Sequence, residues 1–293
     1  MIVVLVISTR TAQEGHAMTT FNTPAPISVT VDIVFGDITF TAGDRTDTVV
    51  EVRPVDPAWE LDVKAAEQAV VEFTDGKLQV KHPKLRNLLS SKYGAVEVLV
   101  ALPTGSNVQG NTARGGYVVS GAVGSCRLKT PTGDIRVERA ASVELRTTGG
   151  KVTVDHVTGQ AEVRANRDIR IRQVDGGAAV KNIGGDSWVG AVGGDLRVSS
   201  ANGHITVDVA RADVDARTAS GDVRVREVGS GAVDLYTAIG EVEVGVPQHT
   251  AVRLDANTTA GRVLNYLEAP EQSDRSVKVR ARSHGGNIIV RHS

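Results

Sequence analysis

The chain has 293 residues, with 33 basic and 34 acidic side chains and a formal net charge of −1. This balance gives no global field that would favour nucleic acid or an anionic membrane. Aromatic residues make up 3% of the chain whereas 31 residues are glycine, a composition that suits narrow β-coils with tight turns. The single cysteine, Cys126, excludes an intrachain disulfide framework and a cysteine-rich zinc site, and we expect a buried thiol.

The N-terminus opens with an apolar run, Met1–Ile7, that is followed by Arg10 and Glu14. This run has no basic leader, and it is much shorter than the roughly 20 apolar residues of a membrane span. We therefore expect a soluble, cytoplasmic protein. Met18 is an equally good start, so residues 1–17 are interpreted as a non-native or upstream-start extension.

Residues 18–93 are predicted to form a small N-terminal cap rich in β-strands. Alternating apolar residues predict strands over 27–33, 38–40 and 49–53. A short helix should follow, with Asp56 as its N-cap and Pro57 at its first position. Its buried face is predicted from the helical spacing of Trp59, Val63, Ala66 and Val70.

Two further features complete the predicted cap. The pair Asp75-Gly76 stands between two alternating segments and predicts a β-hairpin. The stretch Lys81–Arg86, with Lys92, forms a basic loop, which we interpret as a solvated connector; a docking patch for an acidic partner is the alternative.

Residues 94–293 are predicted to form a β-solenoid. A glycine, usually followed by an acidic or polar residue and an alternating apolar strand, recurs at steps of 17, 17, 18, 18, 18 and 19 residues, with one Arg in place of glycine: Gly133, Gly150, Arg167, Gly185, Gly203, Gly221 and Gly240. A fixed period of this kind is typical of solenoids, whose repeats bury their apolar faces against their neighbours. Each coil should hold two short strands, with the residues two, four and about seven positions after the repeat residue facing inward.

A row of acidic residues follows the repeat positions and is the strongest candidate for chemistry: Asp134, Asp168, Asp186, Asp222 and Glu241. Stacked carboxylates could bind a cation or hydrolyse a glycosidic bond. Lys151 and His204 interrupt the row, however, and Gly-Asp pairs are ordinary turn residues that cap backbone N–H groups. We interpret the row as turn chemistry.

The outward positions of the same strands carry mixed side chains: Arg136, Thr153, Arg170, Trp188, Thr206, Arg224 and Glu243. Such a face is usually solvated surface; the alternative is a flat interaction face with Trp188 as an exposed anchor. The seven histidines are scattered, and the sequence has no nucleophile elbow, phosphate loop or dinucleotide fingerprint. We therefore predict no catalytic, cofactor-binding or metal-binding residue, and no enzyme.

The chain ends on a repeat-like strand, residues 286–293, that no helix or polar cap follows. A terminal coil exposes unpaired backbone groups, which can template another strand. We expect this C-terminal coil to be exposed and to mediate self-association, as a tail-to-tail dimer or, alternatively, a fibre.

Three sets of residues carry a family resemblance: Thr23–Thr30, Asp44–Pro54 and the repeated Thr/Ser-x-Gly-Asp units. From Met18 onward the chain resembles the bacterial putative-adhesin β-strand-repeat family, a domain of unknown function, and its actinobacterial branch. The resemblance implies a β-helix-like repeat fold and an adhesin-like role. We expect a non-catalytic binding or scaffold protein with an unidentified protein partner; the alternatives are a self-assembling structural β-helix and a polysaccharide lyase or glycoside hydrolase.

Overall fold

The computed structural model describes residues 11–13, 16–82, 94–268 and 275–293, and the chain forms two compact units, Met1–Gly150 and Lys151–Ser293. In the described part of the chain, α1 (Glu60–Gln68) is the single helix and the other regular elements are strands. The predicted all-β solenoid class with one helix is confirmed. The predicted border between a cap and the repeat region, at residues 93 and 94, lies inside the first unit and stays a prediction.

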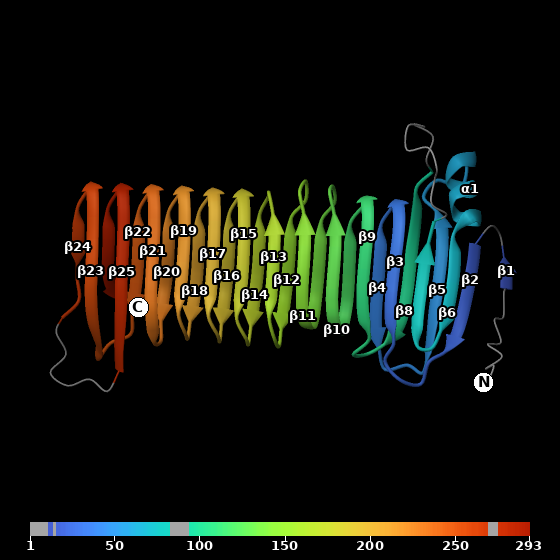
Figure 1. The fold of residues 1–293 in the computed structure, drawn as a ribbon, viewed down its shortest axis with the longest axis horizontal. Helices are drawn as coiled ribbons and strands as arrows, with labels where there is room; N and C mark the ends of the chain where they lie inside the picture. The colour runs from blue at the N-terminus through green and yellow to red at the C-terminus, as the bar shows by residue number, and fades with distance from the viewer. Residues whose placement is uncertain (1–10, 14–15, 83–93, 269–274) are drawn as a thin grey trace. The chain divides into compact units, whose positions relative to one another are not determined.

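The second unit is a β-solenoid in which each coil contributes one strand to each of two parallel ladders (Figure 1). The strands that follow the repeat residues form the first ladder: β12 (Val152–Val157), β14 (Ile169–Val174), β16 (Ser187–Val192), β18 (Ile205–Ala210), β20 (Val223–Val228) and β22 (Val242–Val246). The second ladder contains β13 (Ala161–Ala165), β15 (Ala178–Gly184), β17 (Leu196–Asn202), β19 (Val214–Ser220) and β21 (Gly231–Ile239).

The predicted inward positions form the core of this unit. In β20, Val223, Val225 and Val228 are all fully buried. Because Val225 and Val228 are three residues apart, strict alternation cannot turn both inward. The β18–β20 register accordingly skips the pair Asp208 and Arg226, so the alternation breaks at the same point on both strands. The other neighbouring pairs of this ladder from β12 to β20 skip the equivalent position, so the coils stack in register.

The repeat glycine is required by close backbone stacking at the turn. Gly221 has φ 134°, and a Cβ atom there would lie 2.3 Å from the carbonyl oxygen of Gly203. A hydroxyl on the second ladder reinforces the same corner, since Thr218 Oγ1 donates to the Gly203 carbonyl at 3.2 Å and Thr237 Oγ1 donates to the Gly221 carbonyl at 2.8 Å. At these two corners a glycine with positive φ is therefore combined with a buried threonine.

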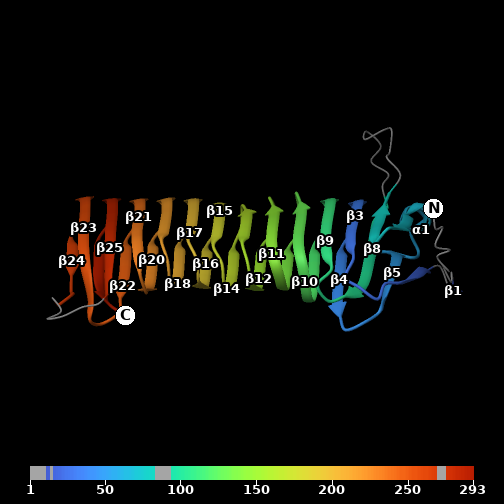
Figure 2. The same cartoon turned by 60° about the horizontal axis from the view of Figure 1, so that its bottom comes forward.

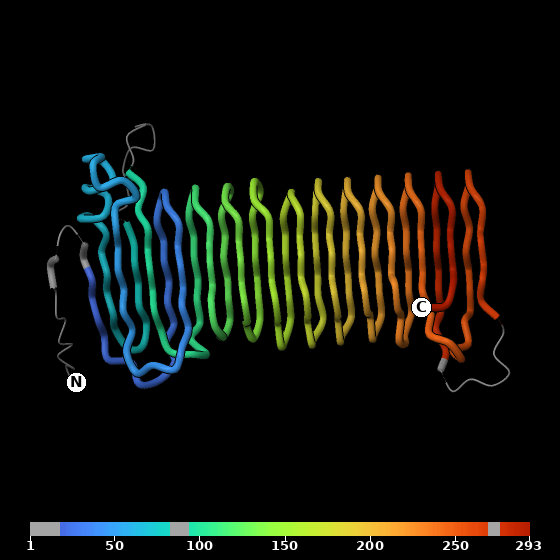
Figure 3. The backbone as a smooth tube through the Cα atoms, turned by 180° about the vertical axis from the view of Figure 1, so that it is seen from behind, coloured from blue at the N-terminus to red at the C-terminus, as the bar shows by residue number. Residues whose placement is uncertain are grey.

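The last two coils of the second unit are interleaved rather than sequential. The strands concerned are β23 (Thr250–Ala260), β24 (Val263–Asn265), β25 (Arg275–Gly285) and β26 (Ile288–His292). Strand β25 pairs in parallel with β21 on one side and β23 on the other, and β26 lies in the same way between β22 and β24. In Figure 3 the dark red C-terminal strands lie inside the orange-red strands that precede them in the chain.

This arrangement shows that the predicted exposed C-terminal coil is wrong. Ile288 and Val290 are fully buried. After β22 the chain leaves one coil position open, forms the coil β23–β24 beyond it, and then returns to fill the open position with residues 275–292. The exposed coil is instead formed by β23 and β24.

The first unit also contains an interleaved coil. Its strands are β1 (Thr11–Gln13), β2 (His16–Asn22), β3 (Ser28–Phe35), β4 (Ile38–Gly43), β5 (Asp47–Pro54), β6 (Val70–Thr74), β7 (Lys77–Lys81), β8 (Val96–Pro103), β9 (Asn107–Arg114), β10 (Tyr117–Thr130) and β11 (Ile135–Thr147). Strand β3 pairs in parallel with both β7 and β9, and β4 with both β8 and β10 (Figure 2). Beyond β7 and β8 the pairing becomes antiparallel, through β6 on one side and β5, β2 and β1 on the other.

The helix differs from its prediction in its start and in most of its buried face, although Ala66 is buried as predicted. Asp56 does not cap α1; its carboxylate accepts from the Ala58 N–H in a turn before the helix, and α1 begins at Glu60. Trp59 is 56% exposed, whereas Asp62 is 2% exposed. The Asp62 carboxylate accepts hydrogen bonds from the backbone N–H groups of Asp56 and Ala95, at 3.0 and 2.8 Å, and so ties the helix to the adjoining strands.

The predicted hairpin is confirmed, since β6 and β7 pair antiparallel around Asp75 and Gly76, both with positive φ. Most of the predicted basic loop, residues 83–93, lies outside the described residues. Lys81, at its start, forms an ion pair with Glu72 at 2.8 Å.

Candidate functional site

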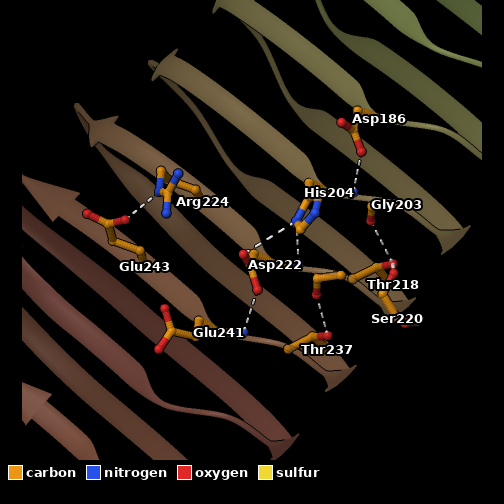
Figure 4. A network of polar contacts seen from close by, with 11 residues as sticks. Asp186, Gly203, His204, Thr218, Ser220, Asp222, Arg224, Thr237, Glu241 and Glu243 are labelled. Atoms are coloured by element: carbon orange, nitrogen blue, oxygen red, sulfur yellow. Dashed lines mark hydrogen bonds and ion pairs between the residues drawn. The ribbon is translucent and has the colours of Figure 1, made fainter.

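The acidic row lies at the turns of the second unit, where each side chain contacts the next coil. Asp186 Oδ1 accepts from the His204 N–H at 2.9 Å, His204 Nδ1 accepts from the Asp222 N–H at 3.1 Å, and Asp222 Oδ1 accepts from the Glu241 N–H at 2.9 Å (Figure 4). Asp168 makes the same contact to the Asp186 N–H at 3.3 Å. These contacts agree with the turn interpretation of the row.

His204 is a member of this row rather than an interruption. Its Nδ1 atom lies 3.1 Å from the Asp222 backbone nitrogen and 3.4 Å from Asp222 Oδ2, so the imidazole occupies the place that a carboxylate has at the other turns. Lys151, the other apparent interruption, forms an ion pair with Asp168 at 3.2 Å. His204 follows a repeat glycine, so its spacing agreed with membership of the row. It was interpreted as an interruption because it is not acidic, although an imidazole nitrogen can also accept a hydrogen bond.

The interleaved C-terminal segment continues the row with an amide. Asn287 Nδ2 donates to Glu241 Oε1 at 3.0 Å, and Asn287 Oδ1 accepts from the Arg262 N–H at 3.0 Å. In the first unit Asp37 has the same role, because its Oδ1 accepts from the Gly116 N–H at 2.6 Å. Asp134 also lies at the start of a coil in that unit, directly before β11.

The row therefore fastens backbone groups of successive turns. Across the described residues, no group of three or more His, Cys, Asp or Glu side chains is arranged to hold a metal ion.

The outward side chains of the first ladder form what we call the lateral row: Thr153, Arg170, Trp188, Thr206, Arg224 and Glu243. The predicted alignment of these residues across neighbouring strands is confirmed by the register. Arg136 lies on β11 in the first unit, where it is exposed and pairs in register with Val118.

Trp188 has a defined position in the lateral row. The Arg170 guanidinium lies over its ring, with the Cζ atom 4.3 Å from the ring centroid. A Cβ atom at Gly190 would lie 2.3 Å from the Arg172 carbonyl oxygen and 2.9 Å from the tryptophan ring, so both the stacked backbone and the indole require the absence of a side chain there. Trp188 is half-buried rather than the fully exposed anchor considered from the sequence.

The other end of the lateral row is an arginine–carboxylate cluster. Glu243 accepts hydrogen bonds from Arg224 and from Arg291, the latter at 2.8 Å from Nε and 2.6 Å from Nη2. Burial raises the pKa of Glu243, but the hydrogen bonds from Arg291 and Arg224 outweigh burial and lower that pKa below its ordinary value. Because Arg291 belongs to β26, this cluster also fastens the interleaved C-terminal segment.

The second ladder carries an opposite row of alternating charge. Arg217 lies 2.6 Å from Asp215 and 3.7 Å from Asp234, and Arg282 lies 2.7 Å from Asp255. Exposed pairs of this kind contribute about 0–1 kcal/mol each. Since acidic and basic groups neutralise one another along this face, it has the character of a solvated surface.

The predicted buried thiol is confirmed. Cys126 is 1% exposed on β10, and burial raises its pKa to about 12. The thiol is therefore protonated at neutral pH and poorly nucleophilic. No helix within the described residues is long and apolar enough to cross a membrane.

Several solved structures are similar to this chain. A putative adhesin from Parabacteroides merdae is 10% identical, with 94% of this chain and 95% of that chain covered and a TM-score of 0.40. A putative adhesin from Bacteroides fragilis is 13% identical, with coverages of 94% and 96% and a TM-score of 0.37. A protein named a putative lipid binding protein, from Parabacteroides distasonis, is 13% identical, with coverages of 94% and 96% and a TM-score of 0.34.

No curated protein matches the chain. The Toastrack DUF4097 family model matches residues 27–291, which include the parallel coils of both units and both interleaved segments. The chain belongs to the Toastrack DUF4097 family.

Proposed function

We propose that this chain is a non-catalytic, adhesin-like β-repeat protein that binds a protein partner through the lateral row. The position of Trp188 carries this proposal. In a chain with only two tryptophans, this one is held on an outward strand face by Arg170 and by the space above Gly190. Tryptophan and arginine are the residues most enriched at the energetic centres of protein interfaces.

The chemistry of the turns supports a binding role over a catalytic one. The oxygens of Asp186 and Asp222 that accept from backbone N–H groups have a structural role, and losing those contacts would loosen the stack. A polysaccharide-cleaving enzyme therefore remains the less favoured alternative. The cytoplasmic location expected from the sequence is likewise part of the proposal, and fractionation of native cells would test it.

The partner hypothesis is tested by capture in native cells with matched variants. Tagged wild-type chain, Trp188→Ala and Tyr236→Ala would be cross-linked in the source bacterium, and the captured proteins compared by mass spectrometry. Tyr236 is 40% exposed on the opposite row and controls for loss of any aromatic side chain. We expect a partner that is captured by wild type and by Tyr236→Ala but lost with Trp188→Ala. Equal capture by both variants would contradict the assignment of the lateral row.

A further inference from the structure

The coil formed by β23 and β24, here called the end coil, leaves the core of the second unit open. Val252, Leu254 and Ala256 of β23 are aligned with Val277, Val279 and Ala281 of β25. The three residues on β25 are at most 1% exposed, whereas the three on β23 are only half-buried. On β24, Val263 is aligned with the buried Ile288 yet is 42% exposed.

The end coil also presents an edge without the usual protection against pairing. Within the described residues β23 pairs with β25 alone and β24 with β26 alone. Strand β23 has 11 residues, about twice the usual length, and contains no proline, no lysine and no inward-facing charge. A long edge of this kind accepts a further strand.

The side chains of β23 are complementary to a second copy of the same strand. A twofold axis at Leu254 that is normal to the sheet would pair two β23 strands antiparallel and would keep the core faces continuous. Leu254 would face its own symmetry mate, and Val252 would face Ala256. On the outer face, each Arg253 would lie opposite the Asp255 of the other copy, so the interface would contain two opposite-charge cross-strand pairs.

The charges available on the outer face fit this pairing. Asp255 contacts Arg282 at 2.7 Å and Arg280 at 3.6 Å, so one carboxylate faces two arginines of its own chain. Arg253 is exposed, and no acidic partner for it occurs within the described residues. In the antiparallel arrangement this arginine gains a carboxylate that the described residues of its own chain do not supply.

We propose that the end coil is a self-association surface, at which two copies of this chain join tail to tail by antiparallel pairing of β23 about Leu254. This inference concerns a surface separate from the lateral row, so either proposal can fail without the other. In the twofold arrangement the free edge of β23 in each copy is paired with the other copy, so no further chain can add there. The result is a dimer rather than a fibre.

The oligomeric state of the full chain tests the proposal. Sedimentation velocity at tens of micromolar should show a dimer. Leu254→Lys would place two ammonium groups at the twofold axis and should leave only monomer. Ile183→Lys, at a position 58% exposed on β15, is the matched control and should remain dimeric. Thermal melts would verify that both variants fold, which is expected because Leu254 is only half-buried.

Two further variants test the register. Arg253→Asp would oppose two pairs of like charges and should weaken the dimer about tenfold. Leu254→Cys should form an intermolecular disulfide under mild oxidation, because opposed residues in antiparallel strands have Cα atoms about 4.5–5.5 Å apart, within disulfide range. Ile183→Cys should not cross-link, and the native Cys126 is too buried to interfere. A monomeric wild type, assemblies that grow beyond a dimer, or a dimer that Leu254→Lys leaves intact would each overturn the proposal.

Discussion

The N-terminal part of the first unit and the C-terminal part of the second unit both contain an interleaved coil, but different strands follow the two interleaved coils. In the first unit, β3 and β4 fill a position between other coils, and antiparallel strands and α1 then follow. In the second unit, β25 and β26 fill the equivalent kind of position, and the parallel coil β23–β24 is left at the edge. Interleaving therefore does not cap a solenoid. In the first unit the pairing becomes antiparallel, and Val50 and Val52 of β5 are fully buried there, whereas Val71 and Phe73 of the edge strand β6 are half-buried.

The largest effect should come from removing the interleaved segment of the second unit. Truncation after Leu267 deletes β25 and β26, which are the strand partners of β23 and β24. Residues 250–265 should then lose their protection against amide hydrogen exchange, because their interstrand hydrogen bonds disappear. Exchange measured by mass spectrometry would check this, and β16 to β18 serve as an internal control that should stay protected. Retained protection over 250–265 would argue against the interleaved topology.

A charged residue at an inward position should destabilise a regular coil much more than the end coil. Val225→Asp puts an unpaired carboxylate at a fully buried position and should cost several kcal/mol. Leu254→Asp, at the half-buried inward position of the end coil, should cost about 1 kcal/mol or less in the monomer. Denaturant unfolding of both variants at low protein concentration measures the two values. Similar losses would mean that the end coil is as well covered as the regular coils.

The closed end of the first unit depends on a buried carboxylate. Asp62→Ala would leave the N–H groups of Asp56 and Ala95 without their acceptor and should destabilise the fold by about 2–3 kcal/mol. Lys64→Ala, on the exposed side of the same helix, should change stability by less than about 0.5 kcal/mol. Thermal and denaturant unfolding would compare the two, and equal effects would show that Asp62 does not fasten the helix.

A smaller, pH-dependent effect is expected where the C-terminal segment is fastened by Glu243. Its pKa is lowered in the folded state, so its contribution is present above the ordinary pKa of about 4.5 and is lost as the pH falls through the folded-state value. Glu243→Gln should destabilise the protein by about 1–2 kcal/mol at pH 7, and the difference from wild type should shrink toward pH 3. Unfolding curves of both proteins between pH 3 and pH 7 would measure this difference in stability. A difference that does not change with pH would exclude the charge of Glu243 as its cause.

Local patterns of the sequence predicted the coils well because each coil repeats the same short-range rules. The inward positions of β20 and the turn role of Asp222 both follow from residue type and spacing. Strand order did not follow, because an interleaved segment such as 286–293 has the same alternation as a sequential one. The available signal was the spacing, since the steps from Gly240 to Gly261 and on to Gly286 lengthen to 21 and 25 residues.

The helix shows a different limit of sequence-based prediction. Its face was predicted from apolar spacing that began at Trp59, but that residue lies in the preceding turn and is exposed. The contact that holds the helix comes from Asp62, a charged residue that composition assigns to the surface. Burial of a carboxylate depends on backbone N–H groups that distant segments supply, and one of these, at Ala95, is 33 residues away in the chain.

The interleaved C-terminus has a consequence for the order of events during synthesis. Strands β23 and β24 leave the ribosome before β25 and β26, at a time when the coil position beside them is vacant. We expect residues 250–265 to stay protease-sensitive in nascent chains until residues 275–292 have emerged and paired with them, whereas the preceding coils can stack as they emerge. Limited proteolysis of a free chain that ends at Glu268 and of the chain through residue 293 would test this, and equal resistance of residues 250–265 would contradict it. The second unit would then be complete only after β25 and β26 have paired with β23 and β24.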